Sequence, residues 1–448
     1  MASAEKRDAG ELIVVGAGVG GLTAAVTLAD RGHWVIVVET SKELGGGAGC
    51  EPEAIAAAGT RTQHEAGIVD DAARLVADVM AAVGEGADRA LVEAAAEQGP
   101  RLIDWLADRC GLGMTLLGDT SQAGHAVRRL HYCGEHGGED LRAALARAAT
   151  RRRRVHLRAG VTVTELRRDE TGKVIGVLLP PDRRGPQLLS GRVLLAGGGF
   201  AGSDELVAQH CPEVAGLPHL AGSPADGSSL RLGLSAGAAT RNLSACTVAP
   251  LLALPGNLQV PIRMIDMGAL LVNQLGVRFT DERGTDLDVA RAIRAQPGGV
   301  AYLLFDERIK AATSADPFFA KVLLARAARQ AEGPTGLARQ FEIAVDGLRT
   351  TIEAAAFESP LQVIRVTGAR RRTLGGLPVD TRARVLDAAG IAIPGLYAAG
   401  DAAAVIGGEH PQKTPEGVHA LATLAYGRIA ALDVAAEAEQ GDEAERAE

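Results

Sequence analysis

A glycine-rich turn between two apolar runs constrains the fold of this chain more than any other feature. Residues 12–15 form a short apolar run of the kind that a buried parallel strand shows. Gly16, Gly18 and Gly21 follow in the spacing G-x-G-x-x-G, and the alanine-rich residues 22–30 predict a helix before a second apolar run. Strand, glycine turn, helix and strand in this order are typical of a dinucleotide-binding unit.

Each part of this stretch has a physical role in holding a dinucleotide. Gly16 permits the tight turn, and Gly21 lets the helix pack closely on the strand. Gly18 lacks a Cβ, so a pyrophosphate can approach the backbone there. The helix N-terminus offers free N–H groups and a partial positive charge to phosphates. Glu39 lies 18 residues after Gly21, near the spacing of about 20 at which an acidic residue binds a ribose hydroxyl. A glycine turn that binds nothing is the alternative.

Length, charge and cysteine content limit the classes of function. The 448 residues suggest two or three domains, and a net charge of −8 argues against a nucleic-acid partner. The five cysteines are scattered and form no C-x-x-C pair, which predicts a reducing compartment and no structural metal. Residues 1–10 lack the apolar core of a signal peptide, and no run of about 18 apolar residues occurs. We therefore expect a cytoplasmic protein without a membrane partner.

Two later strands end in residues suited to a ligand. The run 193–199 ends in three glycines, among them Gly197 and Gly198, and the run 393–401 ends in Gly400-Asp401. In a doubly wound sheet, ligands lie beyond the carboxyl ends of the strands, so these ends are expected near the cofactor.

Other features of the first part of the chain leave alternatives open. The glycine run at 45–49 is either a second place where backbone meets a ligand or a flexible surface loop. Asp226 precedes a predicted helix at 228–236 and is placed to cap it. Residues 53–58 and 66–83 also have helical patterns.

The composition of the chain changes at about residue 238, and from about residue 367 it again resembles that of the first part of the chain. Between these points lie apolar strands at 269–273 and 301–305 and helical patterns at 318–331 and 342–356, without a dinucleotide fingerprint. We therefore predict an α/β fold. Residues 1–237 and 367–448 form a Rossmann-type domain with a doubly wound parallel sheet, and residues 238–366 form an inserted α+β domain.

Five stretches, in order along the chain, carry a resemblance to a known family. They are GAGVGG with Glu39, the glycine run 45–49, LLAGGGF at 194–200 followed by ADGSSLRLGLSAGA at 225–238, GALLVNQLGVRFTDE at 268–282 with YLLFDERI at 302–309, and TLGGLPVDTRARVLDAAGIAIPGLYAAGD at 373–401 followed by YGRIAA at 426–431. With them the chain resembles the FAD flavoproteins of the fumarate reductase and succinate dehydrogenase type, including the 3-ketosteroid dehydrogenases. The resemblance implies FAD and a capping domain that closes over the substrate. We expect noncovalent FAD, because the positions where relatives carry a histidine for covalent attachment have none here.

The resemblance also implies which residues form the FAD site. In such enzymes the Gly-Asp pair at the last strand end meets the diphosphate and ribityl part of FAD. The expected site residues are Gly16, Gly18, Gly20, Gly21, Glu39, Thr40, Gly46, Gly47, Gly197, Gly198, Asp226, Gly400 and Asp401.

The same comparison suggests the groups that move the proton. In this family hydride passes between flavin N5 and one carbon, and an acid/base moves a proton at the neighbouring carbon. The position where reductases carry an arginine and ketosteroid dehydrogenases a tyrosine falls on Asp286. An aspartate carries a proton if a dry site raises its pKa; the alternative is that it caps a helix at 287–295. His410, in the loop after the Gly-Asp strand end, either acts on a carbonyl or acid/base step or simply faces water.

The dicarboxylate clamp of the reductases is largely absent from the sequence. The reductase histidine-proline-threonine segment falls on 248–251, which has no histidine, and the clamping arginine falls near 413–414. Thr414 is a candidate oxyanion donor, and Tyr132 is a weaker catalytic candidate. We predict an FAD-dependent oxidoreductase acting on a CH–CH bond next to a carbonyl, a desaturase or ene-reductase of a mostly apolar cyclic or polyketide-like substrate. A dicarboxylate reductase and a non-redox flavin-binding isomerase are the alternatives.

Overall fold

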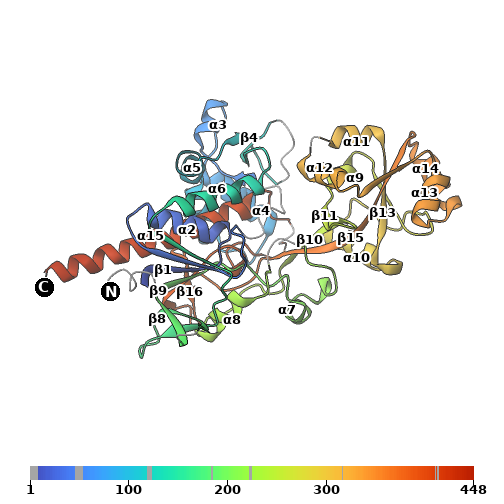
Figure 1. Ribbon diagram of the computed structural model, residues 1–448. Helices are drawn as coiled ribbons and strands as arrows, with labels where there is room; N and C mark the ends of the chain where they lie inside the picture. The colour runs from blue at the N-terminus through green and yellow to red at the C-terminus, as the bar shows by residue number, and fades with distance from the viewer. Residues whose placement is uncertain are drawn as a thin grey trace. The chain divides into compact units, whose positions relative to one another are not determined.

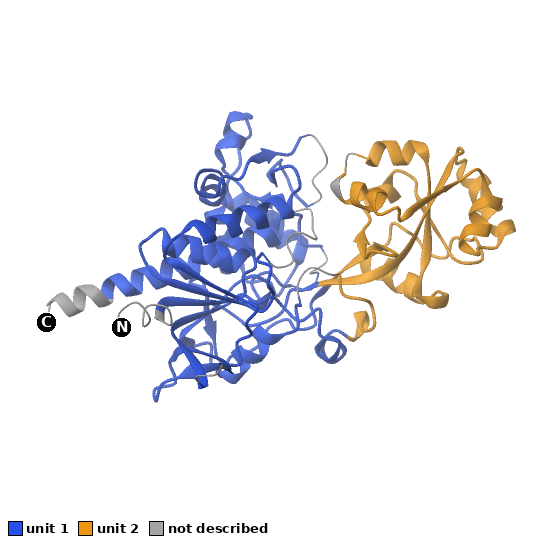
Figure 2. Cartoon of the chain, viewed as in Figure 1, with its two compact units in different colours: residues 1–211, 222–246, 372–448 blue, residues 212–221, 247–371 orange. Residues whose placement is uncertain are grey.

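The chain divides into two compact units in the computed structural model. The structure describes residues 9–45, 54–118, 124–182, 185–220, 224–314, 316–408, 410 and 413–447. Unit 1 comprises Met1–Cys211, Gly222–Cys246 and Arg372–Glu448, and unit 2 comprises Pro212–Ala221 and Thr247–Arg371 (Figure 2). Our sequence prediction placed the inserted domain at 238–366; the structure divides the chain a few residues later at each end and adds the short segment Pro212–Ala221 to unit 2.

Unit 1 is built on an eight-stranded sheet with a parallel centre, in the order β16-β17-β9-β1-β2-β6. The central strands are β1 (Ala9–Val15), β2 (Val35–Glu39), β6 (Val155–Ala159), β9 (Gly185–Leu195) and β17 (Ala392–Ala398), and these five pair in parallel with one another. The hairpin of β7 (Glu165–Arg168) and β8 (Val174–Asp182) and the edge strand β16 (Arg384–Leu386) pair antiparallel. The predicted α/β fold with a parallel sheet is confirmed.

Register brings the ends of three strands of this sheet together. Val15 of β1 lies opposite Leu195 of β9, and Leu195 lies opposite Ala398 of β17. The pairing continues one residue further, because the amide of Ala196 donates to Val15 O at 2.8 Å and the amide of Ala399 donates to Leu195 O at 3.0 Å. The glycine segments that follow these strands therefore start side by side at one edge of the sheet.

Helices cover the sheet of unit 1 and pack closely on one another. α2 (Val19–Ala29) packs against both α6 (Gly138–Arg151) and the long α15 (Val418–Ala447), and α5 (Arg89–Cys110) also contacts α15 (Figure 1). A Cβ added at Gly427 of α15 would lie 2.1 Å from Gly20 O of α2, so these two helices meet backbone to backbone. Two shorter helices, α7 (Asp204–His210) and α8 (Ser228–Ser235), follow β9.

A small antiparallel sheet corrects one prediction. Residues 53–58 have a helical pattern, but Ala54–Ala56 form strand β3, which pairs with β5 (Leu130–Cys133), and β5 pairs with β4 (Met114–Leu116). All three residues of β3 are buried, so tertiary pairing outweighs the helix propensity of alanine. The expected helix at 66–83 is shorter: after α3 (Arg61–Glu65) comes α4 (Ala72–Val83).

Unit 2 contains a six-stranded sheet in the order β11-β10-β15-β13-β12, with β14 paired to β15. Its strands are β10 (Cys246–Ala253), β11 (Leu258–Gln259), β12 (Leu270–Val272), β13 (Ala301–Asp306), β14 (Ala328–Ala331) and β15 (Leu361–Thr373). Its helices are α9 (Arg263–Asp266), α10 (Asp286–Arg294), α11 (Glu307–Thr313), α12 (Pro317–Leu324), α13 (Pro334–Phe341) and α14 (Val345–Ala355). Two clusters of buried aliphatic and aromatic side chains, one including Leu303 and Phe305 and one including Tyr302 and Leu304, use alternate residues of β13.

The long helix predicted at 318–331 is interrupted in the structure. α12 ends at Leu324, Arg326 has a positive φ of 55°, and the chain then pairs as β14 with β15. The positive φ stops the helix, and the free edge of β15 takes the following residues as a strand. Among the helices of the described residues, none is long and apolar enough to cross a membrane.

Candidate functional site

The glycine turn after β1 is closed toward the protein and open toward a ligand. Gly16 has a φ of +107°, and a Cβ there would lie 2.5 Å from Ala196 O; a Cβ at Gly21 would lie 2.2 Å from Gly16 O. At Gly18, by contrast, the nearest atom to an added Cβ is Ala196 O at 3.7 Å. Gly18 is also the N-cap of α2 and supplies no side chain to the first N–H groups. The turn therefore fits a phosphate group at the helix N-terminus.

Glu39 holds the same turn from the end of β2. Its carboxylate accepts hydrogen bonds from the amides of Ala17 at 2.7 Å and Ser41 at 2.8 Å. The expected role on a ribose hydroxyl stays a prediction; a carboxylate keeps further lone pairs beside these two bonds. Thr40 is exposed, and its Oγ1 lies 3.4 Å from the hydroxyl of Thr162.

The glycine run after Glu39 begins beside the turn. The amide of Gly45 donates to Ala17 O at 2.7 Å, and Gly45 forms a parallel bridge with Gly18. A Cβ at Gly45 would lie 1.8 Å from Cγ of Arg142, so only glycine fits there. The predicted site residues Gly46 and Gly47 lie outside the described residues.

The segment after β9 is held by side chains that sequence reasoning did not select. The amide of Gly197 donates to Ser229 Oγ at 3.1 Å, and the amide of Phe200 donates to Thr373 Oγ1 at 3.1 Å. Gly198 has a φ of +84°, which favours glycine. Ser229 and Thr373 stand inside stretches that we quoted for the family resemblance, but nothing local marks them as supports of a turn 32 and 173 residues away.

Asp226 lies at the start of α8 but is not the N-cap. The N-cap is Gly227, and Asp226 Oδ1 accepts from the amide of Ser228 at 2.9 Å. Asp226 is exposed. The side chain thus stabilises the first turn of α8 from one residue further out than we expected.

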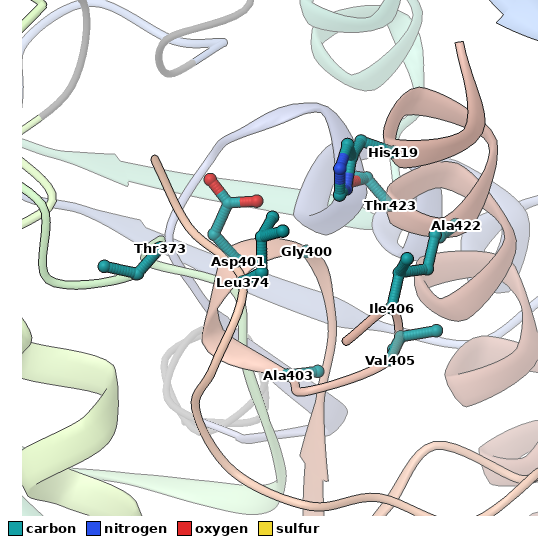
Figure 3. A pocket seen from close by; sticks show the side chains of 10 residues that line it. All are labelled: Thr373, Leu374, Gly400, Asp401, Ala403, Val405, Ile406, His419, Ala422 and Thr423. Carbon is teal, nitrogen blue, oxygen red and sulfur yellow. The ribbon is translucent and has the colours of Figure 1, made fainter. Parts of the chain in front are cut away.

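A small, open hollow lies beyond the end of β17 in unit 1. Figure 3 shows Asp401 and Thr373 on one side and His419 and Thr423 of α15 on the other. Gly400 and Asp401 were predicted here, whereas His419 and Thr423 were not, because their helix reads as an ordinary run of alanine and leucine. The residues that line it are Thr373, Leu374, Gly400, Asp401, Ala403, Val405, Ile406, His419, Ala422 and Thr423.

Comparison with known proteins identifies the family. The family model described as an FAD binding domain matches residues 11–413 of the chain. The chain belongs to this FAD-binding family. The resemblance we inferred and the FAD cofactor are thereby confirmed, and the uncapped α2 N-terminus and the open glycine turn fit the pyrophosphate of FAD.

Relatives of this FAD-binding protein act on carbon–carbon double bonds. It is 29% identical to a fumarate reductase (cytochrome) of Shewanella frigidimarina over 96% of this chain and 77% of that protein. It is 25% identical to the urocanate reductase of Eggerthella lenta over 88% of this chain and 70% of that protein. The FAD-binding protein is therefore an FAD-dependent oxidoreductase of the fumarate reductase family that acts on C=C or CH–CH bonds.

Solved structures share the fold of the FAD-binding protein. A flavocytochrome c3 fumarate reductase in an open conformation matches with a TM-score of 0.87 at 24% identity, over 96% of this chain and 78% of that one. A 3-ketosteroid Δ1-dehydrogenase of Sterolibacterium denitrificans matches with a TM-score of 0.73 at 19% identity, over 96% and 100%. At these identities the matches show the architecture alone.

Asp286 does not cap helix α10, which was the alternative to its proposed role in proton transfer. α10 begins at Asp286, but its N-cap is Thr285, whose hydroxyl accepts from the amide of Asp288 at 3.2 Å. The idea that Asp286 caps the helix was wrong. Partial burial raises the pKa of the Asp286 carboxyl above its ordinary value, and the positive charge of Arg371 offsets part of this rise. By solvent accessibility the residue is nonetheless exposed.

The other three catalytic candidates lie in unit 1, outside the set of residues that line the hollow. His410 has an exposed side chain and an amide that donates to Val83 O at 3.1 Å. Thr414 is half-buried and follows Lys413, whose amide donates to His410 O at 2.9 Å. The hydroxyl of Tyr132 would lie 3.0 Å from a Cβ at Gly137, so it packs against the turn that begins α6. The catalytic roles of all three remain predictions.

Proposed function

We propose that this protein reduces the C=C bond of an α,β-unsaturated carboxylate whose remaining part is mostly apolar. When bound, FAD supplies the two-electron chemistry of such a reaction. Three relatives support the substrate class by their names: fumarate reductase, urocanate reductase and, at 26% identity, the NADH:acrylate oxidoreductase of Vibrio harveyi. Each of the three named substrates is an unsaturated acid.

The observation that carries the proposal is the pairing of an acid and a cation in unit 2. Asp286 is free of the helix cap, and its raised pKa keeps part of it protonated at higher pH than an ordinary aspartate, as a proton donor requires. Arg371 is close enough for its charge to act on that carboxyl. A guanidinium binds a carboxylate with two parallel hydrogen bonds.

Substrate binding to Arg371 would also prepare Asp286 for its role. The charge of Arg371 holds the pKa of Asp286 below the value that burial alone would give. A substrate carboxylate bound to Arg371 neutralises that charge. Asp286 would then hold its proton more firmly until hydride reaches one carbon of the double bond. The proton would then pass from Asp286 to the neighbouring carbon.

We further propose that the chain binds FAD noncovalently, through the glycine turn after β1, Glu39, the segment after β9 and Gly400-Asp401. The open space at Gly18 and the uncapped N-terminus of α2 would take the pyrophosphate. Denaturation of the purified flavoprotein should release all of its yellow colour into the supernatant. Flavin that stays with the precipitated chain would contradict this assignment.

The test of the substrate class uses the purified flavoprotein, reduced with dithionite without air. We expect fumarate, urocanate or acrylate to restore the oxidised flavin absorbance within seconds, and the methyl ester of the same acid to react far more slowly. Re-oxidation by an uncharged cyclic enone such as a 3-ketosteroid, but by none of the acids, would overturn the proposal. It would favour our sequence-based prediction of an apolar ketone substrate, which the absence of a histidine at 248–251 supports.

Replacement of the cation gives a second, sharper test. Arg371→Leu should raise KM for the unsaturated acids about 100-fold, because a charge-assisted pair of hydrogen bonds contributes about 2–3 kcal/mol. The reaction with an uncharged enone should not change. Equal effects on charged and uncharged substrates would show that Arg371 supports the fold instead of the substrate.

A further inference from the structure

A buried ion network in unit 1 surrounds Arg129. The side chain of Arg129 is fully buried, and it donates to Asp70 through Nε at 2.9 Å and through Nη2 at 3.0 Å. Its Nη1 donates to Asp78 Oδ2 at 2.7 Å. The side chain of Asp70 is fully buried, and the side chain of Asp78 is 18% exposed. Charges this far from water are stable only when their partners are in place.

One of the two carboxylates lies just before helix α4 and the other lies in the middle of it. Asp70 directly precedes Asp71, the N-cap of α4, and Asp78 lies about two turns further along the helix. Arg129 comes directly before β5, and its carbonyl accepts from the amide of Ala57, just after β3. The Arg129 side chain therefore fixes the position of α4 against the small sheet of β3 and β5.

The connection between β17 and α15 is attached to both of these elements. We call the described residues 405–408, 410 and 413–418 the 405–418 connection. At one end the amide of His410 donates to Val83 O at 3.1 Å, the last residue of α4. Gly408 packs there too, because a Cβ on it would lie 2.6 Å from Val83 O.

The other end of the 405–418 connection is attached to the small sheet. The amide of Ala56 in β3 donates to Gly417 O at 3.1 Å, and His125 Nε2 donates to Glu416 O at 2.8 Å. A Cβ on Gly417 would lie 2.7 Å from the amide nitrogen of Ala56, so the approach is close. A carbonyl only accepts, so His125 carries its proton on Nε2, and burial, which lowers the pKa of His125, favours this neutral form.

We propose that Arg129 is a positioning residue for the 405–418 connection, acting through Asp70, Asp78 and α4. It sets the spacing between the two attachment points, α4 at Val83 and the small sheet at Ala56. His410 and Thr414, both acid/base or oxyanion candidates, lie on this connection, and His419 and Thr423, which line the hollow, follow it in α15. The kinetic part of this inference rests on the proposed function; the structural part does not.

The test compares Arg129→Met with a matched control, Arg152→Met. Arg152 also donates two hydrogen bonds to one carboxylate, from Nε at 2.8 Å and from Nη2 at 3.0 Å to Asp30. It lies elsewhere, however, between the C-terminal ends of α6 and α2. Amide hydrogen exchange is measured in both variants with FAD bound. We expect exchange in peptides covering 405–418 to rise about tenfold or more in Arg129→Met and to stay as in the wild type in Arg152→Met.

Kinetics and a milder variant complete the test. The kcat of Arg129→Met should fall about 100-fold, as a displacement of about 1 Å can cause, with KM and the flavin spectrum little changed and partial recovery in Arg129→Lys. If Arg129→Met does not fold, Asp78→Asn keeps the Arg129–Asp70 pair and should loosen the same peptides. Unchanged exchange at 405–418 in a folded variant overturns the proposal. If the wild type turns over none of the unsaturated acids, the proposed function fails, and the exchange result still decides the role of Arg129.

Discussion

At the scale of single residues, Asp286 is the side chain whose environment bears most directly on the chemistry. A raised pKa alone would be weak evidence, because many buried carboxyls have one. Here it coincides with a helix start at which a neighbouring residue, Thr285, provides the cap and leaves the Asp286 carboxyl unused by it. A carboxyl that does not cap its helix, carries a raised pKa and stands near a cation is a strong candidate for proton transfer.

We predict that Asp286→Asn lowers the rate of double-bond reduction about 100-fold or more while FAD binding stays unchanged, because a positioned acid contributes about 10²–10⁴-fold. In the wild type the rate should fall as pH rises through the raised pKa of Asp286, since the proton is then lost. The variant should show a flat profile. Steady-state rates from pH 5 to 9 measure both effects.

The control for this prediction lies in the same helix. Asp288→Asn changes the carboxylate that accepts from the Thr285 hydroxyl at 2.7 Å. It should leave the rate and the pH profile as they are, with a small loss of stability only. Equal rates in Asp286→Asn and Asp288→Asn would mean that Asp286 has no part in proton transfer.

At the scale of elements, the strand–turn–helix unit at the start of the chain shows what local sequence can predict. The spacing of Gly16, Gly18 and Gly21 marks a turn that is imposed in part by local contact, since a Cβ at Gly21 would lie 2.2 Å from Gly16 O, and the structure contains that turn. β3 shows the opposite case: Ala54–Ala56 are helix formers by composition, and only pairing with β5, more than 70 residues later, makes them a strand. Ser229 and Thr373 escape prediction for the same reason.

Two glycines of the turn separate cofactor binding from folding. A methyl group at Gly21 would lie 2.2 Å from Gly16 O, whereas at Gly18, with a φ of −69°, it meets no atom closer than 3.7 Å. We predict that Gly18→Ala keeps the melting temperature of the apoprotein within a few degrees but weakens FAD binding about tenfold or more, because the methyl group occupies the approach of the pyrophosphate. Gly21→Ala should destabilise the apoprotein itself. Calorimetry and flavin titration distinguish the two, and unaltered FAD affinity in Gly18→Ala would place the pyrophosphate elsewhere.

At the scale of the whole molecule, the hollow in unit 1 combines segments from distant parts of the chain. Gly400 and Asp401 were predictable because they end an apolar strand in a sheet of known type. His419 and Thr423 were not, since a helix of alanine and leucine gives no sign of which face meets the end of β17. The sequence therefore predicts the residues of a site that belong to a recognisable local motif. It does not predict the residues that tertiary packing brings to the site from elsewhere in the chain.

Buried neutral histidines should make the stability of the molecule depend on pH. His131 is fully buried; its Nδ1 donates to Arg129 O at 2.9 Å, and its Nε2 lies 2.9 Å from the Thr60 hydroxyl. Burial lowers its pKa, as it does for His125 and His219. In the unfolded chain these side chains take up a proton near pH 6.5, while in the folded protein they do so only at lower pH.

The sign of the effect follows from this difference. Above about pH 7 both states are neutral and the stability is complete, whereas below about pH 6.5 the unfolded state binds protons that the folded state does not. The free energy of unfolding should therefore fall by up to about 1.4 kcal/mol per pH unit for each such histidine as pH decreases. Urea titrations from pH 7.5 to 5 measure this slope, and His131→Gln, although less stable at pH 7.5, should show a shallower one. An equal slope in the variant and the wild type would mean that His131 is already charged in the folded state.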